Sequence, residues 1–131
     1  MKLLLDTHIW LWSILEPKRL SPLVAQTLEN PESELWLSPI SIWELLILCE
    51  KGRMALDEEI EVWIRGAMRA LPLREASVTF EVARETGRLQ LSHRDPADHF
   101  LVATAKVFEL TLVTADERLL KARDISVLAN R

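Results

Sequence analysis

Acidic residues follow two apolar runs that lie at opposite ends of this sequence. Asp6 comes directly after the leucine-rich run 2–5, and Asp116 follows the run 110–115. Short leucine- and valine-rich runs without alternation are typical of strands buried on both faces of a parallel sheet. Ligands of such sheets bind outside the carboxyl ends of the strands, so we expect both carboxylates to lie where chemistry is done.

Two further acids, Glu44 and Asp98, occur in helical segments that are otherwise apolar. A carboxylate in apolar surroundings is unfavourable unless a cation or a hydrogen-bond donor meets it. Hard cations such as Mg²⁺ and Mn²⁺ prefer oxygen ligands. The sequence therefore predicts a candidate metal site with the ligands Asp6, Glu44, Asp98 and Asp116.

Helix capping is the alternative role for these acids when each is taken alone, because aspartate is a favoured N-cap residue. Asp6 and Asp116 each stand between a predicted strand and a predicted helix. Asp95 precedes Pro96 and suits the cap of its helix. Asp98, three residues later, is then the acid that faces inward.

Glu44 separates the two roles best. Ser41 and Glu44 have the spacing of a capping box. However, Ser38 and Pro39 form a stronger helix start, with serine as N-cap and proline at the first helical position. A helix that begins there places Glu44 in its second turn, away from the cap, which favours a functional role.

The elements that must position these acids alternate between strands and helices along the chain. Strands are predicted at 3–5, 34–37, 71–73, 111–113 and 125–128. Helices are predicted at 9–15, 22–29, 39–50, 57–70, 75–86, 96–109 and 117–121. This alternation predicts an α/β fold with a mainly parallel sheet and helices on both faces. The length of 131 residues predicts a single domain over 1–131.

The composition is that of an ordinary globular domain, with 49% hydrophobic and 27% charged residues. The net charge of −4 argues against nucleic-acid binding, unless the acids gather at a metal site where bound cations reverse the local field. No apolar stretch is long enough to span a bilayer, and no secretory signal is recognisable. The lone Cys49 fits a reducing compartment, so we expect a cytoplasmic location.

Other catalytic classes fit poorly. His8, His93 and His99 lack the spacing of zinc ligands, and the glycines are too far apart to form a phosphate-binding loop. A phosphatase of comparable fold would place a second aspartate at position 8, where His8 stands. A receiver domain would need paired acids near the first strand and a lysine after a late strand.

Four motifs in series resemble PIN-domain ribonucleases, and in particular the VapC-type toxins of bacterial toxin–antitoxin pairs. They are LLLDTH at 3–8, SIWEL at 41–45, HRDPADHFLVATA at 93–105 and LVTAD at 112–116. Each motif is weak alone, but together they extend over essentially the whole chain in the order and spacing of that family.

This resemblance implies an α/β/α sandwich on a five-stranded parallel sheet. It also implies a Mg²⁺- or Mn²⁺-dependent endoribonuclease toxin that cleaves RNA phosphodiester bonds with a metal-activated water. Asp6, Glu44, Asp98 and Asp116 match the family's acidic positions, and Asp95 matches an extra acid of one subgroup. Such proteins are usually homodimers held inactive by a cognate antitoxin. The alternative is a PIN-like binding module without catalytic activity.

Two positions depart from that subgroup, in which residue 97 is more often large and apolar and residue 99 more often arginine. Ala97 and His99 stand there in this sequence. His99 removes a fixed positive charge beside the site. Arg118, Lys121 and Arg123 are candidate contacts for RNA phosphates, with a solvated helix face as the alternative.

Two sets of residues carry further hypotheses. Thr7 or Thr114 is a candidate donor of a hydroxyl to the attacking water or to phosphate, and an ordinary hydroxyl near a helix start is the alternative. The five tryptophans favour core packing for the most part. A groove between the early helices that accepts an apolar antitoxin segment is the sharper hypothesis, and it rests on Trp10, Trp12, Trp43 and Trp63.

Overall fold

The computed structural model describes residues 1–91 and 94–131 and contains one five-stranded sheet in which every pairing is parallel. The strand order is β3-β2-β1-β4-β5. This arrangement confirms the predicted fold class. The strands are β1 (Lys2–Leu5), β2 (Glu34–Leu37), β3 (Leu73–Glu75), β4 (Thr111–Thr114) and β5 (Val127–Ala129).

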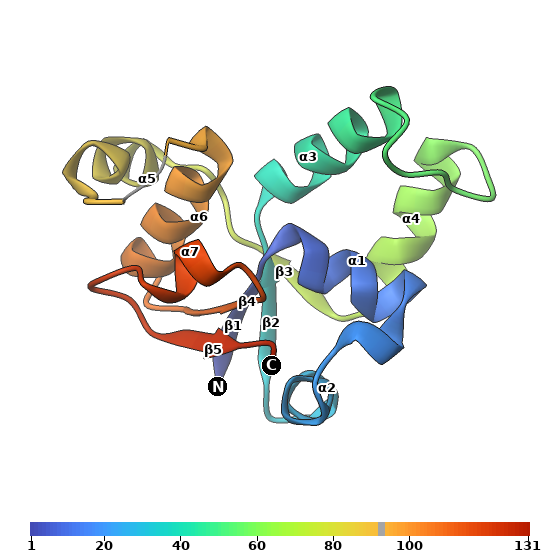
Figure 1. Ribbon diagram of the computed structural model, residues 1–131, viewed down its shortest axis with the longest axis horizontal. Helices are drawn as coiled ribbons and strands as arrows, with labels where there is room; N and C mark the ends of the chain where they lie inside the picture. The colour runs from blue at the N-terminus through green and yellow to red at the C-terminus, as the bar shows by residue number, and fades with distance from the viewer. Residues whose placement is uncertain (92–93) are drawn as a thin grey trace.

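Helices cover both sides of the sheet, as Figure 1 shows. One side carries α1 (Thr7–Leu15), α2 (Pro22–Glu29), α3 (Pro39–Glu50) and α4 (Ile60–Ala70). The other side carries α5 (Phe80–Glu85), α6 (Pro96–Val107) and α7 (Glu117–Leu120). Two short 3-10 helices, η1 (Pro17–Arg19) and η2 (Thr86–Arg88), follow α1 and α5.

Strand β1 lies at the centre of the sheet and contributes to both halves of the core. Leu3 and Leu5 pack into the cluster beneath α1 to α4, whereas Leu4 packs into the cluster beneath α6 and α7. All three side chains are fully buried. This explains why the run lacks the alternation of a strand with one solvated face.

Serine and proline define the helix starts as predicted. The Ser21 hydroxyl accepts from the Val24 amide at 3.2 Å, and the Ser38 hydroxyl accepts from the Ile40 amide at 3.0 Å. Because α3 begins after Ser38, the capping-box alternative for Glu44 is wrong.

The segment around residue 75 differs most from the prediction. Strand β3 lies two residues later than the predicted strand 71–73, and Glu75 pairs with Leu37 instead of opening a helix. The predicted helix 75–86 therefore begins only at Phe80, where the Thr79 hydroxyl accepts from the Val82 amide at 3.1 Å. Strand β3 is an edge strand, as the neighbouring proline indicated.

Other boundaries also shift. Helix α4 begins at Ile60 and not at residue 57, because the carboxylate of Glu59 caps the amides of Glu61 and Val62. The last strand is Val127–Ala129, two residues later than predicted at its start.

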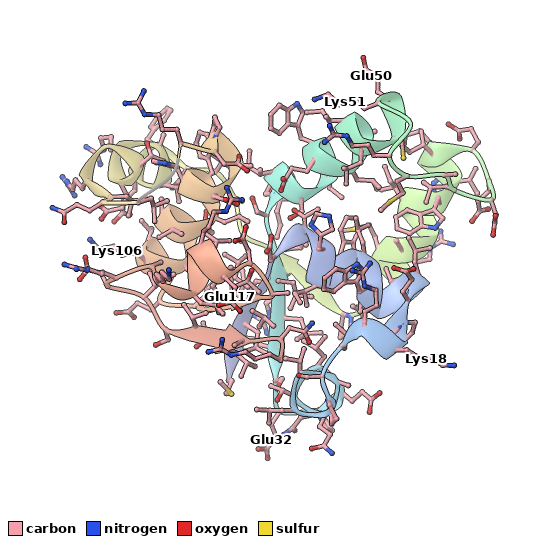
Figure 2. The ribbon with its side chains drawn as sticks, in the orientation of Figure 1. Lys18, Glu32, Glu50, Lys51, Lys106 and Glu117 are labelled. Atoms are coloured by element: carbon pink, nitrogen blue, oxygen red, sulfur yellow. The ribbon has the colours of Figure 1, made fainter. Side chains whose placement is uncertain are left out.

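Charged side chains lie at the rim of the molecule. Figure 2 shows Lys18, Glu32, Glu50 and Lys51 pointing outward, and all four are exposed. Among the described residues, no helix is long and apolar enough to cross a membrane.

The order of the strands creates a crevice between β1 and β4. The chain builds β2 and β3 on one side of β1 and then crosses over to place β4 and β5 on the other side. In open α/β sheets, such a reversal at the carboxyl ends of the strands is the usual position of a ligand site.

Candidate active site

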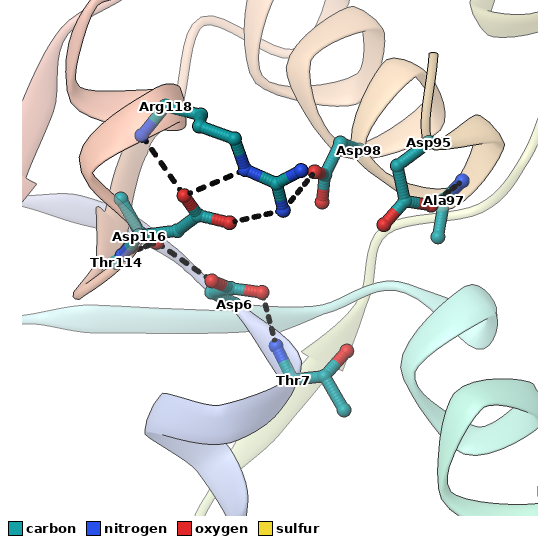
Figure 3. Close-up of polar contacts among 8 residues, drawn as sticks. All are labelled: Asp6, Thr7, Asp95, Ala97, Asp98, Thr114, Asp116 and Arg118. Atoms are coloured by element: carbon teal, nitrogen blue, oxygen red, sulfur yellow. Dashed lines mark hydrogen bonds and ion pairs between the residues drawn. The ribbon is translucent and has the colours of Figure 1, made fainter. Parts of the chain in front are cut away.

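A pocket of about 310 Å³ lies at this crevice, and all of the predicted acids line it. Asp6 comes from the end of β1 and Asp116 follows β4, while Glu44 and Asp98 come from helices on opposite sides of the sheet. Figure 3 shows three of these acids facing one another. The remaining lining residues are His8, Trp12, Asp95, Ala115 and Arg118.

Asp6 is fixed from both sides. Its backbone amide donates to the Val113 carbonyl of β4 at 3.0 Å, which holds it beside the neighbouring strand. One carboxylate oxygen accepts from the Thr7 amide at 2.8 Å, and the other accepts from the Thr114 hydroxyl at 2.6 Å. Asp6 is thus both the N-cap of α1 and a wall of the pocket.

Thr7 joins Asp6 to Glu44. The Thr7 hydroxyl lies 2.5 Å from a carboxylate oxygen of Glu44 and 2.8 Å from the Ser41 hydroxyl. These contacts tie the first turn of α1 to α3, so the position of Glu44 depends on packing between two helices. The structure therefore directs the hydroxyls of Thr7 and Thr114 to carboxylates.

Burial and mutual repulsion affect the protonation of these acids. Desolvation is the main cause that raises the pKa of Asp6, against the hydrogen bond from Thr114. The pKa of Glu44 is raised to about 7, chiefly by desolvation and also by the negative charges of Asp6, Asp95 and Asp98, against the hydrogen bond from Thr7. Burial in the pocket thus disfavours the ionised forms of Asp6 and Glu44.

Arg118 forms ion pairs with the acids on the α6 and α7 side of the pocket. Its Nη2 lies 2.9 Å from one Asp116 oxygen, and its Nε lies 3.2 Å from the other. The same Nη2 lies 3.8 Å from an Asp98 oxygen. Asp116 also caps α7 by accepting from the Arg118 amide at 2.9 Å. Figure 3 shows the guanidinium between the two carboxylates.

The two acids of α6 divide their roles as predicted. Asp95 is the N-cap and accepts from the Ala97 amide at 3.0 Å. Asp98 is buried in the first turn and faces the pocket.

The histidines take different positions. His8 lines the acidic pocket, whereas His99 lines a separate pocket with Arg94 and Phe100. In the pocket of the acids, Arg118 supplies a guanidinium. His93 lies outside the described residues.

The donor set fits a hard divalent cation, because it consists of carboxylate oxygens gathered around one pocket. Nevertheless, within 1–91 and 94–131, no three histidine, cysteine or acidic side chains converge closely enough to hold a metal ion as they stand. The acids share a pocket, and the guanidinium of Arg118 lies against two of them.

Sequence reasoning missed the contacts of Arg118 and Ser41. The sequence offers Arg118 as a contact for RNA phosphates or as part of a solvated helix face, and neither hypothesis includes its ion pairs with Asp116 and Asp98. Ser41 was considered as a cap, and nothing in its neighbourhood indicated the contact with Thr7. The contacts of Arg118 with Asp98 and of Ser41 with Thr7 join distant parts of the chain, so the sequence carries no local signal for them.

A parallel α/β sandwich with acids from opposite helical layers at its central crevice defines a known class of protein. The chain belongs to the PIN domain family, whose profile matches residues 3–125. It is 37% identical over 117 residues to Ribonuclease VapC22 of Mycobacterium tuberculosis, which covers 88% of each chain.

Solved structures agree on the fold. The chain is similar to VapBC2 of Rickettsia felis bound to a promoter DNA fragment, with a TM-score of 0.76, 15% identity and 98% coverage of each chain. It is also similar to VapBC-5 of Mycobacterium tuberculosis, a member of the VapBC family of toxin–antitoxin systems. That match has a TM-score of 0.62, 16% identity and 98% coverage of each chain.

Proposed function

We propose that this protein is a Mg²⁺- or Mn²⁺-dependent endoribonuclease and the toxin component of a type II toxin–antitoxin system. The observation that carries the proposal is the gathering of Asp6, Glu44, Asp98 and Asp116 around one pocket at the crevice between β1 and β4. The relationship to Ribonuclease VapC22 supports RNA as the substrate. Residues 1–131 act as one PIN-like domain in this proposal.

Each acid has a role that follows from its contacts. Asp6, Glu44, Asp98 and Asp116 are the proposed metal ligands, directly or through water. A bound Mg²⁺ or Mn²⁺ would supply a water of lowered pKa for attack on the phosphate and charge neutralisation at the leaving oxygen. Thr7 and Thr114 orient the carboxylates of Glu44 and Asp6 by donating to them. These hydrogen bonds keep the carboxylates in the orientation that metal binding requires.

An antitoxin partner fits both the comparisons and the surface. VapBC-5, which this chain resembles in fold, belongs to a toxin–antitoxin family. Helix α3 exposes Trp43 and Leu46, which are three residues apart and share one side of the helix. These side chains suit an apolar antitoxin segment. Trp10 and Trp63, in contrast, are buried in the core.

A homodimer and a cytoplasmic location complete the proposal. The dimer is the usual assembly of the family that this chain resembles. The free Cys49 supports a reducing compartment.

Cleavage by the purified protein tests the proposal. The wild type is incubated with RNA and Mn²⁺ or Mg²⁺, with EDTA as the control, beside Asp6→Asn and Asp98→Asn. Asparagine caps a helix as well as aspartate does but is a poor metal ligand. We expect each variant to keep its circular dichroism spectrum and to lose about 100-fold or more in cleavage rate.

Two outcomes would contradict the proposal. Unchanged cleavage by both variants would mean that neither aspartate is a metal ligand and that Asp6 serves only as the cap of α1. Metal binding by the wild type without any RNA cleavage would favour a non-catalytic PIN-like module. Co-expression with the product of the neighbouring open reading frame tests the partner, and an antitoxin should abolish the cleavage.

A further inference from the structure

Arg118 occupies two of the proposed metal ligands at once. Its guanidinium engages both oxygens of Asp116, at 2.9 and 3.2 Å, and approaches Asp98 at 3.8 Å. The turn that caps α7 places it there, because Asp116 accepts from the Arg118 amide as well. The side chain is therefore the counter-charge of these acids in the structure described.

A guanidinium and a divalent cation compete for the same carboxylates. Both are cations, and their repulsion grows as water is excluded from the site. Among the described residues, no three acids converge as a metal chelate while Arg118 lies against two of them. Binding of an ion through Asp116 and Asp98 thus favours a different position of the guanidinium.

The structure offers Arg118 a second place. It also lines an adjacent pocket of about 320 Å³, together with Lys121 and Arg123. The Arg118 side chain is 55% exposed, so packing does not prevent a change of rotamer. The three basic side chains suit a phosphate of a nucleic-acid backbone, which arginine binds through two parallel hydrogen bonds.

We propose that Arg118 is a positioning residue that couples metal binding to RNA binding. Without a divalent ion it pairs with Asp116 and Asp98, and with the ion bound it turns toward Lys121 and Arg123 to hold an RNA phosphate beside the scissile one. This inference rests on the proposed ribonuclease function. Because coupling between two ligands is reciprocal, RNA must also strengthen metal binding by the same factor.

Calorimetric titration with Mn²⁺ and no RNA tests the first half. Arg118→Gln removes the charge and keeps much of the side-chain length. Arg118→Lys keeps the charge but lacks the planar guanidinium with its paired donors. We expect Arg118→Gln to bind Mn²⁺ about 5- to 10-fold more tightly than the wild type, at the lower end of the range typical of coupled sites, with Arg118→Lys in between. Circular dichroism verifies the fold of each variant. Wild-type or weaker Mn²⁺ affinity in Arg118→Gln would overturn the proposal.

Fluorescence anisotropy with a short 2′-O-methyl oligoribonucleotide tests the second half. Saturating Mn²⁺ should strengthen oligonucleotide binding to the wild type by at least about 5-fold, and this gain should fall to about 2-fold or less in Arg118→Gln. Arg123→Gln is the matched control. It should weaken oligonucleotide binding equally with and without Mn²⁺ and leave the Mn²⁺ affinity unchanged. A full Mn²⁺ gain in Arg118→Gln would overturn the phosphate contact.

The two proposals fail in different ways. Suppose that the wild type cleaves no RNA but Arg118→Gln binds Mn²⁺ more tightly than the wild type. This result would contradict the proposed ribonuclease function and would still support competition between Arg118 and the metal ion. RNA cleavage by a wild type whose Mn²⁺ affinity does not respond to Arg118→Gln would contradict the role of Arg118 alone.

Discussion

Single residues in this site carry two structural roles at once. Asp6 caps α1 through one carboxylate oxygen and faces the pocket, and Asp116 does the same for α7. Capping and metal binding are therefore compatible for both aspartates. A cap fixes the carboxylate without using all of its lone pairs, since an ionised carboxylate offers about four acceptor positions.

Thr114 provides the sharpest test at this scale. Its hydroxyl donates to Asp6 at 2.6 Å and accepts from the Asp116 amide at 3.0 Å. Thr114→Val keeps the shape and removes both bonds, so we expect the free energy of unfolding to fall by about 1–3 kcal/mol. We also expect a 10- to 100-fold weaker Mn²⁺ affinity by calorimetry, as is typical for loss of an orienting partner.

Thr104 is the matched control for this substitution. It is equally buried, and its hydroxyl donates to the Phe100 carbonyl within α6 at 2.6 Å. Thr104→Val should leave the Mn²⁺ affinity unchanged. An equal loss of affinity in both variants would show that the effect arises from general loosening of the core.

At the scale of elements, an ion-pair cluster joins α5 to α6. Glu85 is buried, and its carboxylate lies 2.6 Å from the Lys106 ammonium and 3.1 Å from the Arg88 guanidinium. The hydrogen bond from Lys106 is the largest cause that lowers the pKa of Glu85 below its ordinary value of 4.5, against the effect of desolvation. This cluster fastens the short helix α5 to the helix that carries Asp98.

Stability should therefore depend on pH through Glu85. Because the folded pKa is lower than the unfolded one, the ionised group stabilises the fold above about pH 4.5, and the contribution is lost as the pH falls through the folded pKa. We expect Glu85→Gln to have a lower urea midpoint than the wild type at about pH 7, and the difference to shrink as the pH falls below 4.5. Glu81→Gln, at an exposed position of α5, should show little change.

The same scale shows what the sequence could and could not predict. Helices with local caps, such as the start of α3 at Ser38, were predicted because the signal lies within a few residues. The segment near Glu75 was not, since its pairing with Leu37 connects distant parts of the chain. The acids of the pocket were predicted from strand ends. The contact between Arg118 and Asp98 was not, because it depends on how α7 packs beside α6.

Over the whole molecule, the site links the two helical layers across the sheet. Glu44 belongs to the layer with α1, and Asp98 belongs to the layer with α5 and α7. A cation held between them would connect both halves of the core. A ligand that binds only the folded state raises its stability in proportion to the logarithm of its concentration.

Thermal unfolding measures this effect. At a Mn²⁺ concentration of about 100 times the dissociation constant, we expect a gain of about 2.7 kcal/mol, which corresponds to a rise of roughly 10 °C in the unfolding midpoint. The unfolding midpoint of Asp98→Asn should rise much less with Mn²⁺. Addition of excess EDTA should abolish the rise in the wild type. An equal rise in Asp98→Asn would indicate that Mn²⁺ binds elsewhere.

The central position of β1 also determines when the active protein can appear during translation. Asp6 leaves the ribosome early, but its partner Thr114 follows 108 positions later. At about 5–20 residues per second, this interval lasts roughly 5–20 s. Throughout it, the three leucines of β1 lack their β4 neighbour, and the pocket lacks Ala115, Asp116 and Arg118. A nascent chain therefore lacks one of the proposed metal ligands until Asp116 is synthesised, so the site can be completed only after most of the chain has left the ribosome.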